Sequence, residues 1–247
     1  PTATAFRVVS LAAFVLLVIA AYRFFNRRFD SPLAAATVTT LLLFNRHFVG
    51  HPLWAAFHAN DLAALALFLI ALDALYDARW RTFALAIALG QLARETSFIL
   101  IPVGAALLVE RKSWRTQARP FLMAVIPGIV VFATLRLVIE PKGGHGLFEK
   151  FFAVLSVKPL SLDAWLRTFI TPFAPLTLIP IVFARASLAF FRSRLHLVVL
   201  FGAAVVASLF GWNTERLMAP AGIVVFLFVG HLVTESARDE IPRWRAT

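Results

Sequence analysis

Long apolar runs alternate with short polar gaps along most of this chain, and lysine and arginine gather in every second gap. Cytoplasmic loops of membrane proteins carry an excess of these residues, so the alternation indicates several membrane crossings in a fixed orientation. Composition agrees, because a soluble domain with 60% hydrophobic and only 15% charged residues could not cover its surface. The sequence therefore predicts an all-α, polytopic transmembrane helix bundle that forms one domain over residues 1–247.

Nine apolar helices can be placed along the chain by their hydrophobic pattern. A spanning helix needs about 20 apolar residues, and shorter helices fit where the protein is thin or the helix is re-entrant. The predicted helices cover Ala5–Phe25, Leu33–Phe44, Leu62–Tyr76, Thr82–Leu92, Phe98–Val109, Phe121–Ile139, Phe169–Phe183, Leu195–Phe210 and Leu217–Val233.

The basic gaps set the predicted orientation. Fifteen of the 24 Lys and Arg residues fall in alternate gaps, which places the N-terminus outside and the C-terminus in the cytoplasm, in a membrane such as the bacterial inner membrane. The fifteen are Arg23, Arg27, Arg28, Arg79, Arg81, Arg111, Lys112, Arg115, Arg119, Arg185, Arg192, Arg194, Arg238, Arg243 and Arg245.

The segment Thr82–Val109 allows two topologies. It is either one long helix with Arg94 and Glu95 at its middle, or two short helices that meet at this pair. A single crossing would put one basic cluster on the wrong side and would bury a charge at a cost of about 2.5–3.5 kcal/mol. The two-helix hairpin is therefore the preferred prediction.

The long outer loop from Glu140 to Arg167 contains one amphipathic stretch. Five apolar residues share one helical face, which is typical of a helix that lies on the membrane surface or of an ordinary interfacial connector. The five are Leu147, Phe148, Phe151, Phe152 and Leu155.

Some functions can be excluded or set aside. The net charge of +11 comes mostly from arginines beside helix ends, where they meet anionic lipid headgroups. The predicted partners are therefore membrane lipids, and no nucleic-acid partner is predicted. The chain has no cysteine, so thiol chemistry is excluded. His47 and His51 have metal-ligand spacing, but Gly50 and Pro52 interrupt the helix that would present them. No metal site or cofactor is predicted, although a divalent ion at Asp61 stays an alternative.

Polar residues that membrane anchoring does not explain gather on the predicted outer side, where ionisable groups at membrane depth suggest function. A catalytic role falls to Asp61, and substrate binding to the others. The candidate site consists of His58, Asn60, Asp61, Arg94, Glu95, Glu215 and Arg216.

Each candidate also has a structural explanation. Asp61 behind Asn60 could cap a helix, or could take a proton from an acceptor hydroxyl. Arg94 could simply reach interfacial water beside Glu95, or could hold a phosphate with its guanidinium fork. Glu215 suits the first turn of the last helix, but capping does not account for Arg216.

Three short segments resemble the GT-C superfamily of membrane glycosyltransferases, and the resemblance runs over most of the chain. They are Phe57-His58-Ala59-Asn60-Asp61-Leu62, Leu92-Ala93-Arg94-Glu95-Thr96 and Asn213-Thr214-Glu215-Arg216-Leu217. The resemblance implies transfer of a sugar from a polyprenyl-phosphate donor to an acceptor on the extracytoplasmic side. Arg94 and Arg216 would then hold the phosphate of this lipid-linked donor, where they stabilise the leaving group.

The chain departs from that family at one point. Its members usually carry an acidic catalytic residue in a first outer loop, and no such loop is visible here. The resemblance therefore implies a fragment that lacks the first helix and its acidic loop. In such a fragment Asp61 is at most a supporting residue, and the chain alone can be inactive. A transporter or flippase with broken helices, and a membrane scaffold without chemistry, are the alternatives.

Overall fold

The computed structural model describes residues 2–45, 49–50, 59–138, 161–163, 166, 176, 178–210 and 218–244. Within these ranges the chain is helical apart from turns and short connections, and they contain no β-strand. The predicted all-α class is confirmed.

The helices follow one another with few connecting residues. Their bounds are α1 Thr2–Phe29, α2 Pro32–Leu43, α4 Ala59–Tyr76, α5 Trp80–Ala93, the 3-10 helix η3 Glu95–Ile99, α6 Leu100–Glu110, α7 Trp114–Val138, α10 Leu178–Val182, α11 Ala184–Arg192, α12 Leu195–Phe210 and α14 Ala219–Trp244.

The described helices supply fewer membrane spans than nine apolar helices would. Four are long and apolar enough to cross a bilayer, and the bent pair α11 and α12 makes up to five. At about 1.5 Å per residue the 12 residues of α2 and the 14 of α5 reach about 20 Å, well short of a hydrocarbon core of about 30 Å. The chain thus has several apolar helices compatible with a multi-pass membrane protein, and some of the described helices are shorter than a full span.

Two predicted elements lie wholly or mostly outside the described residues. Of the helix predicted over Phe169–Phe183, only the part Leu178–Val182 is described as helical. The amphipathic stretch Leu147–Leu155 is outside the described ranges.

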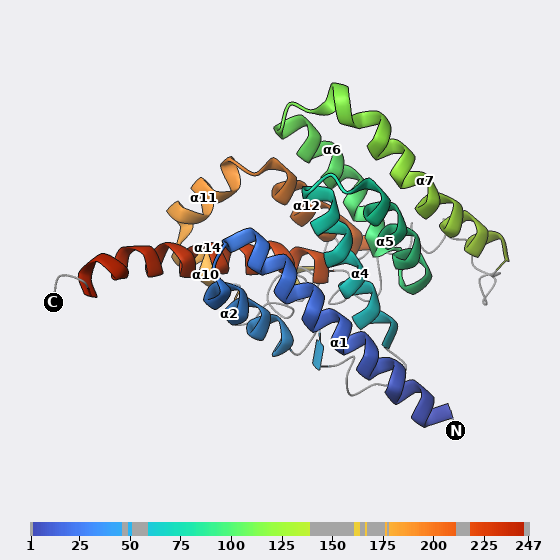
Figure 1. Cartoon of the computed structure of the whole chain (residues 1–247), viewed down its shortest axis with the longest axis horizontal. Helices are drawn as coiled ribbons and strands as arrows, with labels where there is room; N and C mark the ends of the chain where they lie inside the picture. The colour runs from blue at the N-terminus through green and yellow to red at the C-terminus, as the bar shows by residue number, and fades with distance from the viewer. Residues whose placement is uncertain are drawn as a thin grey trace.

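The long helices form two layers. In the first layer α4 packs against α1 and α5, and α5 packs against α7. In the second, α14 packs against α2 and α12, and α12 packs against α6. Figure 1 shows the first layer running from α1 (blue) to α7 (light green), with α14 (red) passing beside α1 and α2.

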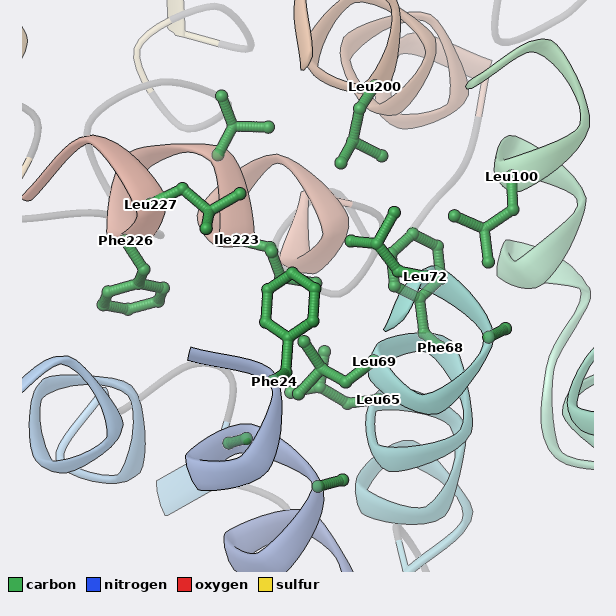
Figure 2. Close-up of a cluster of buried hydrophobic side chains, with 14 of the residues drawn as sticks. Phe24, Leu65, Phe68, Leu69, Leu72, Leu100, Leu200, Ile223, Phe226 and Leu227 are labelled. Carbon is green, nitrogen blue, oxygen red and sulfur yellow. The ribbon is translucent and has the colours of Figure 1, made fainter. Parts of the chain in front are cut away.

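Aromatic and leucine side chains fill the space between the layers. Phe24 of α1, Phe68 and Leu72 of α4, Leu100 of α6 and Ile223 of α14 are each at most 1% exposed. They point toward one another in Figure 2. One contiguous core therefore joins helices far apart in the sequence.

Apolar side chains also cover the outer faces of α1 and α7. Val8 and Leu11 on α1 are each 62% exposed, and Met123 on α7 is 61% exposed. Soluble monomers rarely expose contiguous apolar patches of this kind, whereas lipid tails solvate them. Both faces are suited to contact with the bilayer.

The segment between α5 and α6 forms the predicted hairpin. Arg94 has extended backbone angles (φ −165°, ψ 146°), which end α5. After η3 the chain runs back toward the start of α5. This is shown by Arg111, just after the end of α6, whose Nη1 donates to the carbonyl oxygen of Tyr76 at 2.6 Å, close to the start of α5. The break at Arg94 is confirmed.

One end of the bundle collects arginines, as the charge alternation predicts. Contacts described below bring together Arg27, Arg28, Arg79, Arg111 and Arg194, and we call this the arginine-rich end. Which side of a membrane it faces stays a prediction.

A short helix at this end was not predicted. The sequence interpretation treated residues 184–194 as a charged gap, but residues Ala184–Arg192 form α11, which lies at 106° to the axis of α12. Its Phe190 is buried against the bundle while Arg185 and Arg192 are exposed. Such a helix suits the membrane surface.

Candidate functional site

Asp61 lies in the first turn of α4, at the end of the bundle opposite the arginine-rich end. Its side chain is only 8% exposed. A carboxylate here is stabilised by the N-terminal end of the helix dipole. Because a carboxylate is rarely buried without a cation beside it, the Asp61 side chain also needs an ion-pair partner.

Arg94 is that partner. One of its Nη atoms lies 3.0 Å from an Oδ atom of Asp61, and the Arg94 side chain is 21% exposed. The extended backbone at Arg94 ends α5 here, and the side chain of this residue reaches across to α4. The structure therefore joins two residues that the sequence interpretation selected separately.

A buried hydrogen bond holds the break after α5. Gln91 donates from Nε2 to Oγ of Ser97 at 2.7 Å, and both residues are buried. A Cβ atom at Gly90 would lie 2.8 Å from the same Oγ, so only glycine lets η3 pack this closely. These contacts position Arg94 from both sides in the sequence.

The other sequence candidates have different outcomes. Asn60 is exposed at the start of α4. Glu95 begins η3, and only its backbone is described. His58, Glu215 and Arg216 lie outside the described residues, so their place relative to Asp61 stays a prediction.

The pair has a defined chemical capacity. A guanidinium carries five N–H donors, so Arg94 can keep a carboxylate and still donate to an incoming phosphate oxygen. Asp61 fixes the direction of that fork and is itself an acceptor for a proton. Among the described residues no three His, Asp or Glu side chains group in a way that could hold a metal ion.

A second polar cluster, at the arginine-rich end, was missed. The hydroxyl of Tyr76 lies 2.6 Å from Nε2 of His196, and Nδ1 of His196 lies 2.7 Å from Oε2 of Glu110. Since a carboxylate only accepts, Nδ1 carries the proton and Nε2 of a neutral ring accepts from the tyrosine. The chain of bonds joins α4, α6 and α12.

Two arginines lie beside this cluster. The guanidinium of Arg28 is 4.5 Å from the ring centre of Tyr76, and that of Arg111 is 5.8 Å away. The sequence signal was present, because each residue adjoins a predicted helix end. The two arginines were interpreted only as charges that set the membrane orientation, and Tyr76, Glu110 and His196 were not selected.

Comparison of the chain with models of protein families, with curated proteins and with solved structures finds no match.

Proposed function

We propose that this protein is a membrane glycosyltransferase that moves a sugar from a polyprenyl-phosphate donor to a hydroxyl acceptor on the extracytoplasmic side. The observation that carries the proposal is the Asp61–Arg94 pair, a buried carboxylate held against a partly exposed guanidinium at one end of an apolar bundle. The lipid-facing surfaces of α1 and α7 are compatible with a donor that arrives within the bilayer.

The chemistry assigns one role to each residue. The bond between the sugar's anomeric carbon and the phosphate oxygen breaks, and the electron pair leaves with polyprenyl phosphate. A bond from the acceptor oxygen to the anomeric carbon forms, and the acceptor proton passes to Asp61. Arg94 stabilises the charge that develops on the departing phosphate.

Release of polyprenyl phosphate tests the proposal without knowledge of the acceptor. The full-length protein in lipid nanodiscs is incubated with polyprenyl-phosphate-linked hexoses and pentoses and a panel of hydroxyl acceptors. Removal of one such electrostatic donor lowers rates by about 10²–10³-fold, so Arg94→Gln should lose most of the release and Arg94→Lys should retain part of it. Arg185→Gln, an exposed charge on α11, is the matched control.

Two results would contradict the proposal. One is that no donor of the panel releases polyprenyl phosphate; the other is that Arg94→Gln, correctly folded, releases it as fast as the wild type does.

A lipid or solute transporter is the second candidate, because the described helices contain two breaks. The break at Arg94 and the 106° bend between α11 and α12 are discontinuities of the kind that line transport sites. Translocation of a fluorescent lipid by reconstituted liposomes, in the absence of sugar transfer, would favour it.

A further inference from the structure

A cavity of about 300 Å³ opens at the arginine-rich end, apart from the candidate site. Its lining includes Arg28 of α1, Tyr76 of α4, Glu110 of α6, Arg194 and His196 at the start of α12, and His231 of α14. Asp61 lies 15 residues before Tyr76 on α4, which is about 22 Å along the helix axis. The cavity is therefore a separate place in the molecule.

The cations outnumber the anions in its lining. Arg28 and Arg194 face the single carboxylate of Glu110, and Glu110 is already engaged by His196. His231 in turn lies beside Glu235, a residue that is mostly exposed. With the histidines neutral, the lining carries a net positive charge.

Arg194 has donors to spare. Its Nη1 donates to the carbonyl oxygen of Phe190 at 3.0 Å and to Oγ of Ser193 at 3.2 Å, and its guanidinium lies 4.2 Å from the ring centre of Phe190. Among the described residues no carboxylate lies within ion-pair distance of it. The phenyl ring holds the fork in place while leaving N–H groups for a ligand.

Arg28 also keeps an unused donor. Its Nη2 binds Asp73 and Asp77, whose carboxylates also serve Arg27 and Arg79, so three arginines share two acids. Its Nε is buried and has no hydrogen-bond partner among the described residues. A buried donor without an acceptor costs stability, so an acceptor from a ligand would be favourable.

The position of the cavity suits the membrane surface. Phe190 and Arg194 come from α11 and the turn after it, and α11 has the exposed arginines of an interfacial helix. Basic pockets between transmembrane helices on one membrane side are typical binding sites for phosphate-bearing headgroups.

We propose that this cavity binds a phosphate group, held by Arg194 and Arg28. The group is either the headgroup phosphate of an anionic phospholipid or a soluble phosphate, and the chemistry that recognises it is the same. The inference does not rest on the proposed function, since none of its residues belongs to the Asp61–Arg94 pair.

Titration of the delipidated chain with phosphatidylglycerol or phosphatidylcholine in mixed micelles, followed by native mass spectrometry of the bound lipid, tests the proposal. We expect phosphatidylglycerol to bind at least about tenfold more tightly than phosphatidylcholine, and Arg194→Gln to weaken it about tenfold. Arg192→Gln, two residues away and exposed outside the cavity, should bind phosphatidylglycerol with an affinity within about twofold of the wild type. Leu227→Phe narrows the cavity without changing a charge and should also weaken binding.

A parallel arm identifies the source of the phosphate. If inorganic phosphate raises the melting temperature of the wild type but not of Arg194→Gln, and phosphatidylglycerol binds no better than phosphatidylcholine, the ligand is soluble. The proposal is overturned if phosphatidylglycerol binds Arg194→Gln as tightly as the wild type and inorganic phosphate raises the melting temperature of both proteins equally or of neither. It is also overturned if Arg192→Gln loses as much affinity as Arg194→Gln, because general surface charge then explains the binding.

Discussion

The guanidinium of Arg94 lies 3.0 Å from the carboxylate of Asp61 and so ties the break after α5 to the first turn of α4. Arg94→Gln removes the cation and leaves the carboxylate, which is 8% exposed, without that ion pair. Breaking a buried pair from one side is strongly unfavourable, and partial exposure of Arg94 reduces the effect to about 2 kcal/mol. Denaturant unfolding in detergent measures the loss.

The double variant Asp61→Asn with Arg94→Gln separates stability from chemistry. Asp61→Asn also removes the buried carboxylate charge that Arg94 stabilised, so the double variant should recover much of the lost unfolding free energy. It should not recover release of polyprenyl phosphate. A double variant that is as unstable as Arg94→Gln alone would show that the carboxylate is not the source of the destabilisation.

Asp73 should matter more to stability than Asp77, although both accept from the same arginines. Asp73 accepts from Arg27 and Arg28 at 2.8 Å and from Arg79 at 2.5 Å, and its side chain is 13% exposed against 35% for Asp77. We expect Asp73→Asn to lower the unfolding free energy by about 1–3 kcal/mol and Asp77→Asn by less than about 1 kcal/mol. Equal losses would contradict this ranking.

Helix positions were largely predictable, because local signals set them. Ser31 accepts a hydrogen bond from the backbone N–H of Ala34 at its Oγ, 3.3 Å away, and Pro32 follows at the first position of α2. Both are standard helix-start signals that the sequence displays directly. The break at Arg94 was predictable too, since a charged pair in an apolar run favours a turn over a crossing.

Pairings between distant residues were not predictable. Asp61 and Arg94 were both selected as unusual charges, yet no local pattern links positions 33 residues apart. The packing of α5 and η3 on α4 brings them together. Tyr76, Glu110 and His196 come from three helices, and each resembles an interfacial anchor when considered alone. Helix α11 was missed because its nine residues give too short a periodic pattern among charges.

The hydrogen-bonded chain from Tyr76 through His196 to Glu110 should act as a unit. Tyr76→Phe removes the hydroxyl that lies 2.6 Å from Nε2, and Glu110→Gln removes the charged acceptor of Nδ1. Each change should lower the unfolding free energy by about 1 kcal/mol. Because both bonds depend on one imidazole ring, the loss of unfolding free energy in the double variant should differ from the sum of the two single losses by at least about 0.5 kcal/mol. Strict additivity would mean that the two bonds are independent.

Gly104 should be intolerant of a side chain, and Gly202 should not. A Cβ atom at Gly104 would overlap the ring of Phe121, which is buried and lies against the rings of Trp80 and Phe83. At Gly202 the same atom would meet nothing within 4 Å. Gly104→Ala should therefore lower the unfolding free energy by about 1–3 kcal/mol. Gly202→Ala should be neutral or stabilising by up to about 1 kcal/mol, because alanine favours a helix interior.

The orientation of the bundle can be tested with single cysteines, since the chain has none of its own. Asn60 is exposed at the Asp61 end of the bundle. Thr116 is exposed near the start of α7, at the arginine-rich end, since the neighbouring Gln117 accepts from Nε1 of Trp80, next to Arg79, at 2.9 Å. If the arginine-rich end faces the cytoplasm, an impermeant thiol reagent added to intact cells should label Asn60→Cys and not Thr116→Cys. Permeabilised cells should label both, which controls for access to each thiol. The reverse pattern in intact cells would show that the bundle has the opposite orientation in the membrane. It would place the Asp61–Arg94 pair on the cytoplasmic side, where an extracytoplasmic transferase cannot act.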